Sequence, residues 1–433
     1  MIIKNIIYKN NNFFNQLKRF LEKRKFDQNQ NSLIVKKIIN DVRKNEDKAV
    51  LKYEKKFNKN PKIKIGDFKY SNNEINKFIK KLDYRTKKSI DISYRRIKKF
   101  HSMQMMKTFS FKDSLNIKLS YKSSPIDRVG VYVPGGTANY PSTVLMNCIP
   151  AIVAGVKKMY LTTPSDRKNI NPAVIYAAVK CGVKEIYSIG GAQAIAAFAF
   201  GTKKINKVDK IVGPGNLFVS AAKKEVYGDV GIDMIAGPSE VLVVADKYSN
   251  PDWIAADLIA QAEHDRFAQS ILLCNDKKII LDVNKKLKTQ LKNLPKKRIA
   301  LSSLKKFGCS LLVKNINNFS KVINEIAPEH LQIDLKKPER IIKKIKNAGS
   351  IFIGKYSPEA MGDYLAGPNH VLPTSGSAKF SSGLSVYDFL KRHSFIKISK
   401  SGIERLGPLV INLAKYEKLE GHANSIKIRI KRN

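Results

Sequence analysis

Between residues 128 and 355 the chain alternates short apolar runs with longer segments in which apolar residues recur at helical spacing. A first series of predicted strands comprises Val129–Val133, Met159–Thr162, Glu185–Ile189 and Lys210–Val212. A second series comprises Val241–Ala245, Ser270–Cys274, Leu311–Val313, Leu331–Ile333 and Ser350–Ile353. Predicted helices separate the strands, in the first series near residues 143–155, 172–181, 192–200 and 217–227. This alternation predicts parallel sheets covered by helices on both faces, so we expect an α/β fold with two doubly wound lobes.

The flanking segments carry a mainly helical pattern. Apolar residues from Val35 to Val42 mark one helix face, and Asn45 offers a left-handed helix end before the helix resumes. The stretch Ser71–Glu74 has the spacing of a capping box at the start of another helix. A long basic helix is expected over residues 85–104, and beyond about residue 385 the pattern becomes a polar, helical tail.

Composition is that of a folded protein without a membrane segment. Hydrophobic residues make up 43% of the 433 residues, which is enough to build substantial cores. The stretch Met1–Phe26 has no continuous apolar run, which argues against a secretory signal or a membrane anchor. The most apolar segments are shorter than the ~20 residues that a membrane-spanning helix needs. We therefore expect a cytoplasmic protein that has no membrane partner.

The formal net charge of +44 is a prominent feature of the composition. Such a charge attracts polyanions, and the basic stretch 285–298 resembles a phosphate-binding strip. Leucines recur within it at helical spacing, so its lysines can equally form one solvated helix face. The lysine enrichment runs through the whole chain, and no RNA-recognition signature or zinc finger is present. We expect no specific nucleic-acid partner, although a basic nucleic-acid-binding protein remains an alternative class.

The four cysteines are Cys148, Cys181, Cys274 and Cys309, and no two form a C-x-x-C pair. A disulfide framework or a thiolate metal site is therefore not expected, and we expect each cysteine to be a small buried hydrophobic residue. Cys148 follows a Gly-rich loop closely in the sequence, which keeps a thiol nucleophile open as an alternative.

Gln261 and His264 stand three residues apart at the end of a predicted helix over Trp253–His264. This spacing places both side chains on one helix face, where an imidazole nitrogen and an amide oxygen can share a metal ion. The alternative is a histidine that caps the last carbonyl groups of a helix.

Two further histidines stand beside carboxylates. Glu329 precedes His330 where a loop enters a predicted strand, and this pair can activate water and accept a proton near neutral pH. His370 shares a loop punctuated by Gly and Pro with Asp363, a candidate oxygen ligand. The alternatives are an ordinary helix-end pair for the first two residues and Asx capping of the loop for Asp363.

Gly-rich turns follow three strands of the first series, at Gly135–Gly136, Gly190–Gly191 and Gly213–Gly215. Such turns bring backbone N–H groups close to a phosphate, with help from the helix that follows. None has the G-x-G-x-x-G spacing of a dinucleotide site, and a tight strand-to-helix turn explains any single one. Three turns along one sheet edge nevertheless favour a ligand crevice.

Taken together, these segments of the chain resemble the histidinol dehydrogenase family. The resemblance spans about residues 45–425. The strings that carry it are GVYVPGG (130–136), GGAQAIAAFAFGT (190–202), VDKIVGPGN (208–216), AGPSEVLVVAD (236–246), LIAQAEHD (258–265), APEHLQI (327–333), AGSIFIG (348–354) and GDYLAGPNHVLPT (362–374).

The resemblance implies two incomplete Rossmann-like lobes, with small, mainly helical terminal segments that intertwine in a homodimer. We expect the parts to be an N-terminal helical segment (1–27), a discontinuous first lobe (28–130 and 238–385), a second, NAD-binding lobe (131–237) and a C-terminal dimerisation tail (386–433).

The resemblance also implies the reaction, which is oxidation of L-histidinol to L-histidine by two NAD molecules, through an aldehyde that stays bound. Matched by motif, the zinc ligands are Gln261, His264 and Asp363, with His422 supplied by the partner subunit. Matched in the same way, the substrate contacts are Ser239, Gln261, His264, His330, Asp363, His370, Glu417 and His422, and the NAD contacts are Tyr132, Gln193 and Asn216.

Roles for two of these residues follow from their chemistry. We expect His330 to remove the alcohol proton and Glu329 to activate water for hydration of the aldehyde. A zinc hydrolase that uses Glu329, and a thiol-dependent aldehyde dehydrogenase that uses Cys148, remain alternative enzyme classes.

Overall fold

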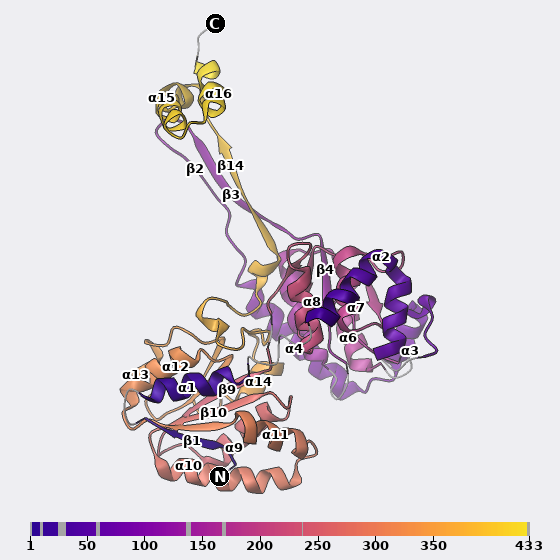
Figure 1. Ribbon diagram of the computed structural model, residues 1–433, viewed down its shortest axis with the longest axis vertical. Coiled ribbons are helices and arrows are strands. Elements are labelled where there is room, and N and C mark those ends of the chain that lie inside the picture. Colours follow the sequence, from indigo (N-terminus) through magenta and orange to yellow (C-terminus); the bar gives the residue numbers. More distant parts are fainter. Residues whose placement is uncertain are drawn as a thin grey trace.

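The computed structural model describes residues 2–8, 12–24, 32–57, 61–135, 140–166, 170–235 and 237–430. Two α/β lobes lie side by side, and a slender arm extends away from both of them (Figure 1). Within the described ranges, no helix has the length and apolar character needed to cross a membrane.

The first lobe is built on a six-stranded sheet in which every pairing is parallel. In sheet order its strands are β1 (Lys4–Ile7), β11 (Cys309–Leu312), β10 (Gln269–Cys274), β9 (Glu240–Ala245), β12 (His330–Asp334) and β13 (Ser350–Ile353). Strands β9 and β10 are buried along their whole length, as expected for parallel strands that are covered on both faces.

Helices cover both faces of this sheet. One face packs against α1 (Asn12–Glu22), α12 (Phe319–Ile326) and α13 (Glu339–Ile342). The other face packs against α9 (Pro251–Ala262), α10 (Lys277–Gln290) and α11 (Lys297–Phe307). The short helix α14 (Glu359–Tyr364) contacts both α9 and β12.

The second lobe is built on a five-stranded parallel sheet. Its strands, in sheet order, are β6 (Glu185–Tyr187), β5 (Lys158–Thr162), β4 (Arg128–Tyr132), β7 (Lys210–Val212) and β8 (Gly231–Ile232). One core contains residues of α2 (Ser32–Phe57), α7 (Gly191–Phe200) and α8 (Leu217–Val226). The other contains residues of α3 (Asn72–Lys80), α4 (Tyr84–Ser102), α5 (Pro141–Ala154) and α6 (Pro172–Lys180).

The arm is a three-stranded antiparallel sheet that carries two helices at its far end (Figure 1). Its strands, in sheet order, are β14 (Leu390–Lys397), β3 (Lys118–Pro125) and β2 (Phe109–Lys112), and its helices are α15 (Lys400–Tyr416) and α16 (Glu420–Ile430). Short 3-10 helices complete the fold at Ile65–Asp67, Leu291–Asn293, Ile316–Asn318, Ser377–Lys379 and Val386–Phe389.

The prediction of an α/β fold with two parallel sheets is confirmed. The capping box at Ser71 and Glu74 is present, with each residue bonding the backbone N–H of the other. The expected interruption near Asn45 lies one residue later, at Glu46, which has φ 46° and ψ −127° inside α2. Helix α9 ends at Ala262, so His264 lies just beyond it rather than inside it.

Packing differs from the expected division of the first 130 residues. The segment 1–27 includes strand β1, which pairs with β11, so this segment belongs to the first lobe rather than standing apart as a helical unit. Helices α2 and α4 pack on α7 and α5, which places these two helices on the second lobe and not, as expected, on the first. Apolar periodicity identifies the buried face of a helix, but it does not identify the sheet that the face will cover.

The arm strands also differ from the expected helical flanks. The segment before residue 130 contains β2 and β3, and the C-terminal tail begins with β14. Strand β2 is exposed along its whole length, and so is β14 after its first residue. Neither strand has a buried side to impose the alternating pattern by which strands are recognised.

Candidate active site

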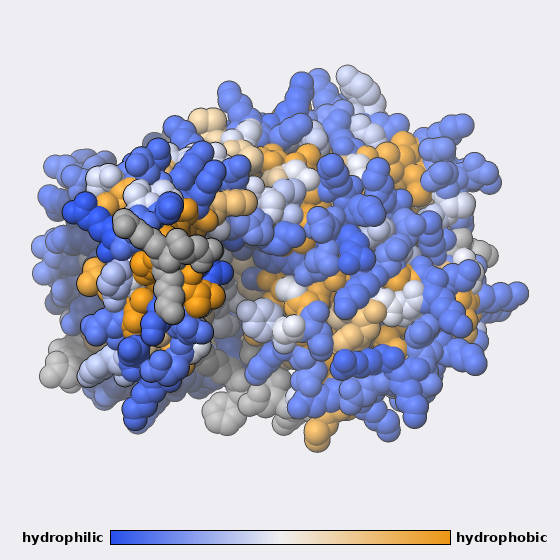
Figure 2. Space-filling model, turned by 90° about the horizontal axis from the view of Figure 1, so that it is seen from above, coloured by the Kyte–Doolittle hydropathy of each residue, from blue (hydrophilic) through white to orange (hydrophobic). Residues whose placement is uncertain are grey.

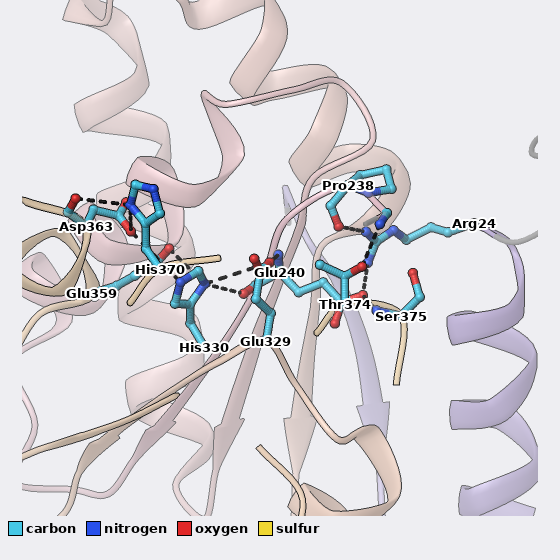
Figure 3. A network of polar contacts seen from close by, with 11 residues as sticks. Arg24, Pro238, Glu240, Glu329, His330, Glu359, Asp363, His370, Thr374 and Ser375 are labelled. Atoms are coloured by element: carbon cyan, nitrogen blue, oxygen red, sulfur yellow. Dashed lines mark hydrogen bonds and ion pairs between the residues drawn. The ribbon is translucent and has the colours of Figure 1, made fainter. Parts of the chain in front are cut away.

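Charged and polar side chains gather at the amino edge of the first-lobe sheet (Figure 3). His330 is the first residue of β12 and Glu240 is the first residue of β9, two adjacent parallel strands. In Figure 3, His330 lies between Glu240 and Glu329 on one side and Glu359, Asp363 and His370 on the other. Residues expected from the sequence to act together therefore do meet in space.

His330 is buried, and its hydrogen bond identifies the ring nitrogen that carries the proton. Its Nδ1 lies 3.1 Å from the carbonyl oxygen of Glu240. Because a carbonyl oxygen can only accept, Nδ1 is the donor and the neutral ring keeps a lone pair on Nε2. Nε2 is buried and has no hydrogen-bond partner among the described residues. Burial lowers the pKa of His330 to about 4, so the neutral form, a proton acceptor, prevails near pH 7.

Glu329 lies against the other side of the His330 ring. Its Oε2 accepts a hydrogen bond of 2.7 Å from the backbone N–H of Glu240, and it lies 3.8 Å from Nδ1 of His330. Burial, followed by the nearby carboxylate of Glu240, raises the pKa of Glu329 well above its ordinary value. Once ionised, a carboxylate with a raised pKa is a stronger base than an exposed one.

Asp363 and His370 close the opposite side of the cluster. The Nδ1 of His370 lies 3.1 Å from the carbonyl oxygen of Asp363 and 3.7 Å from its Oδ1. Burial lowers the pKa of His370, so its neutral form is favoured too. The Oδ1 of Asp363 lies 3.9 Å from the free Nε2 of His330.

Glu359 joins the cluster although the sequence analysis did not select it. Its Oε1 lies 3.2 Å from Nδ1 of His330. When the amide of Gln261 is oriented with its nitrogen toward Glu359, it donates to both carboxylate oxygens, at 3.1 Å to Oε2. Glu359 and Asp363 stand four residues apart on α14, a spacing that places both on one helix face and could have revealed the pair.

The donor set of this cluster fits a divalent cation. One ligand atom from each of His330, Glu359 and Asp363 lies within 4.8 Å of the others. Burial, together with the charges of Asp363 and Glu329, raises the pKa of Glu359 well above its ordinary value, so this carboxyl group favours a proton unless a cation offsets the neighbouring negative charges. With the amide nitrogen of Gln261 directed at Glu359, its oxygen is left available as a ligand. Nitrogen and oxygen ligands of this kind suit zinc.

The other expected ligands and substrate contacts lie at different distances from the cluster. His264 is exposed, yet close enough for its charge to contribute to lowering the pKa values of His330 and His370. Ser239 directly precedes Glu240 and is half-buried. Glu417 is the C-cap of α15 and His422 lies in α16, so both are at the far end of the arm and outside the cluster of their own chain (Figure 1).

The expected NAD contacts lie at the carboxyl edge of the second-lobe sheet. Tyr132 ends β4, and its hydroxyl accepts a hydrogen bond of 3.1 Å from the N–H of Gly191. Gln193 stands in the first turn of α7 and donates through Nε2 to Oε1 of buried Glu54 at 2.8 Å. Asn216 caps α8 by accepting from two backbone N–H groups. These residues follow three parallel strands of one sheet, so their loops share an edge.

The Gly-rich turns at this edge have a structural reason for their glycines. A Cβ at Gly213 would approach the carbonyl oxygen of Tyr132 to 2.1 Å, and the residue has φ +112°. A Cβ at Gly190 would approach Pro164 to 2.5 Å. Close packing of neighbouring loops thus accounts for both glycines, while their N–H groups still line the edge. Gly136 lies outside the described residues.

Cys148 is poorly suited to act as a nucleophile. It is fully buried in α5, and a contact with Cys181, together with burial, raises its pKa well above the ordinary value. The thiolate is the reactive form of cysteine, so this environment suppresses reactivity.

Comparison with known proteins identifies the family to which the chain belongs. The family model of histidinol dehydrogenase matches residues 21–430. The chain is 56% identical to the histidinol dehydrogenase of Pelagibacter ubique, over all of both chains. It is 48% identical to that of Clostridium acetobutylicum, over 92% of each chain. The crystal structure of histidinol dehydrogenase from Elizabethkingia anophelis superposes with a TM-score of 0.93 at 38% identity, covering 99% of this chain and 98% of that one. The chain therefore belongs to the histidinol dehydrogenase family.

Proposed function

We propose that this chain oxidises L-histidinol to L-histidine through bound L-histidinal, with two molecules of NAD⁺, as the final steps of histidine biosynthesis. Family membership makes the chain an oxidoreductase. The observation that carries the finer proposal is the neutral, buried His330, whose unpartnered Nε2 adjoins Asp363 and whose ring packs against Glu329.

Protons and hydrides move in three steps. His330 accepts the alcohol proton at Nε2 while the carbon-bound hydrogen leaves as hydride to the first nicotinamide. Glu329 then removes a proton from water as the water oxygen adds to the aldehyde carbon, and protonated His330 returns its proton to the carbonyl oxygen, which gives the hydrate and leaves His330 neutral again. His330 accepts the proton of the hydrated aldehyde while the second hydride leaves to a second NAD⁺, which yields the acid.

We propose that Gln261, His264 and Asp363 hold a zinc ion, together with His422 of the partner subunit. Bound zinc would hold the imidazole and amine groups of the substrate, which converts hydride transfer into an oriented reaction. Glu359 orients the Gln261 amide so that its oxygen is directed away from the carboxylate. Ser239, His330 and His370 line the substrate position on the same chain.

We propose that Tyr132, Gln193 and Asn216 contact NAD⁺. They share the carboxyl edge of a parallel sheet with the N-termini of α7 and α8, where backbone N–H groups suit a pyrophosphate. Glu54 fixes the side chain of Gln193 relative to the Gly-rich turn, because it accepts hydrogen bonds both from Gln193 and, at 2.9 Å, from the N–H of Gly190.

A homodimer with shared active sites explains the arm. Several large apolar side chains of its helices are exposed, namely Leu409, Val410, Leu413, Tyr416 and Ile428. Figure 2 looks along the arm onto the lobes and shows apolar patches within a mainly hydrophilic surface. A contiguous exposed apolar face indicates an interaction site. We propose that a second copy covers it and that Glu417 and His422 of the partner subunit complete the substrate pocket.

The test of the reaction is incubation of the purified protein with L-histidinol and NAD⁺. Two NADH should form per histidine, and chelation should abolish the activity until zinc is restored. His330→Asn should lose activity, whereas the matched control His393→Asn, on the exposed arm strand β14, should retain it. Absence of NADH from the zinc-loaded protein would refute the proposal.

The test of the shared site is complementation between inactive variants. His422→Ala and His330→Ala damage different halves of a site that two subunits build. Mixed dimers should recover part of the activity, because some of their sites contain neither substitution. Lack of any recovery in verified mixed dimers would mean that each chain completes its own site.

A further inference from the structure

A buried ion pair joins the N-terminal segment to the residue that holds both proton-transfer groups (Figure 3). Arg24 lies just after α1, and its Nη1 lies 2.7 Å from Oε1 of Glu240. The side chains are 4% and 6% exposed, so the pair is shielded from water and from competing salt. Ser375 adds a hydrogen bond of 2.9 Å from its backbone N–H to the same oxygen.

The backbone of Glu240 is the support shared by Glu329 and His330. Its N–H donates to Glu329 at 2.7 Å, and its carbonyl accepts from Nδ1 of His330 at 3.1 Å. The first bond sets the direction of the carboxyl group, and the second selects the tautomer that leaves Nε2 free. A shift in the first residue of β9 therefore displaces both groups together.

Arg24 also holds the loop that leads into β9. Its Nη2 donates to the carbonyl oxygen of Pro238, and the N–H of Gly237 donates to Oγ1 of Thr374 at 2.6 Å. One guanidinium thus binds both the side chain of Glu240 and the backbone two residues before it. This two-point contact restrains the position and the tilt of the Glu240 peptide, which a single hydrogen bond would not do.

We propose that Arg24 and Glu240 are positioning residues for the reaction, because their buried ion pair fixes the peptide that orients Glu329 and His330. This inference rests on the proposed function. It assigns the N-terminal segment a part in catalysis, although Arg24 precedes Glu240 by 216 positions and donates to Glu240 and Pro238 rather than to either proton-transfer residue. The competing explanation is that the pair only attaches α1 to the first lobe.

The experiment compares four variants of the full-length, zinc-loaded protein. Arg24→Met removes the guanidinium and leaves a buried carboxylate uncompensated, so its folding is at risk. The double variant Arg24→Met with Glu240→Gln removes both charges and avoids that cost. Arg24→Lys keeps the charge, and Phe20→Ala is the matched control, because it loosens the buried packing of α1 without touching Glu240.

We expect the double variant to retain its zinc content and the KM for histidinol but to lose kcat by roughly tenfold or more, the usual effect of removing a residue that orients a reacting group. Arg24→Lys should recover part of that loss, and Phe20→Ala should lower the melting temperature with kcat nearly unchanged. A double variant whose kcat equals that of Phe20→Ala at a similar melting temperature would overturn the inference. If the unsubstituted protein forms no NADH, the proposed function itself fails and this inference fails with it.

Discussion

The loop that carries Asn216 is held by a buried ion pair whose removal should have a large, local effect. Lys223 and Asp233 have side chains that are 3% and 1% exposed and bond each other directly. The Nζ of Lys223 also donates to the carbonyl oxygen of Gly213 at 3.0 Å, and Oδ2 of Asp233 accepts from the N–H of Gly213 at 2.8 Å. The pair therefore holds both backbone polar groups of Gly213, at the start of the turn that leads to Asn216.

Lys223→Met should destabilise the second lobe strongly. The substitution leaves the Asp233 carboxylate buried without its cation, and breaking a buried pair in this way costs about 3–5 kcal/mol. For a lobe of this size the melting temperature should fall by roughly 6–20 °C. The freed turn should also raise the KM for NAD⁺ more than it lowers kcat, because Lys223 lies in the second lobe and the proton-transfer residues lie in the first.

The assay is thermal unfolding combined with steady-state kinetics at varied NAD⁺. Lys36→Met is the matched control. Lys36 of α2 pairs at 3.6 Å with Glu225, which lies in α8 as Lys223 does, but the side chains of this pair are 54% and 36% exposed. That variant should lose at most about 1 kcal/mol. Equal stability losses in the two variants would refute the reasoning from burial, and an unchanged KM for NAD⁺ would refute the link to the loop.

Three further predictions concern other parts of the chain. Burial raises the pKa of Asp257 to about 6, despite the hydrogen bond from Gln332. Because the pKa in the folded state lies above the pKa in the unfolded state, the contribution of Asp257 to stability is complete below about pH 4 and is lost as pH rises through 6. Asp257→Asn should therefore stabilise the fold, and its gain over the unsubstituted protein should grow by about 1 kcal/mol between pH 5 and pH 8 in denaturant titrations. Cys148→Ala should cost about 1 kcal/mol of stability for the small cavity but keep most of its kcat, and loss of NADH formation in a folded variant would revive the thiol mechanism. Leu413→Asp, at a residue 63% exposed on α15, should shift the protein toward monomers in light scattering and lower its activity, whereas Leu281→Asp on α10 should do neither.

Elements with a buried face could be predicted from the sequence, and elements without one could not. The strands of both lobes are apolar because helices cover them on two sides, and that burial is visible as short apolar runs. The arm strand β14 is exposed and rich in lysine and arginine, and its pairing with β3 buries no face that would impose an alternating pattern. Pairing of β1 with β11 joins segments about 300 residues apart, which no local pattern encodes.

The candidate site divides along a similar line. Glu329, His330 and Asp363 could be selected because carboxylates and histidines in Gly- and Pro-rich surroundings have recognisable chemistry. Glu359 was missed because its four-residue spacing from Asp363 is informative only on a helix, and this segment was expected to be a loop. Arg24 and Glu240 were missed because their significance depends on a contact between the end of α1 and the start of β9, which only the folded chain creates.

In the proposed reaction the two sheets contribute opposite edges, which would let residues from distant motifs cooperate. In parallel α/β sheets, ligands usually bind beyond the carboxyl ends of the strands, and the expected NAD loops of the second lobe obey this rule. The first lobe contributes its amino edge, where His330 and Glu240 begin their strands. Tyr140, in the loop after β4, lies near the first lobe, because Tyr364 and Asp265 of that lobe contribute, after burial, to raising its pKa. We therefore expect a nicotinamide bound at the carboxyl edge of the second-lobe sheet to lie beside the proton-transfer groups at the amino edge of the first-lobe sheet. Each lobe then supplies what the other lacks, which is why relative displacement of the lobes should impair hydride transfer before it impairs binding of either ligand.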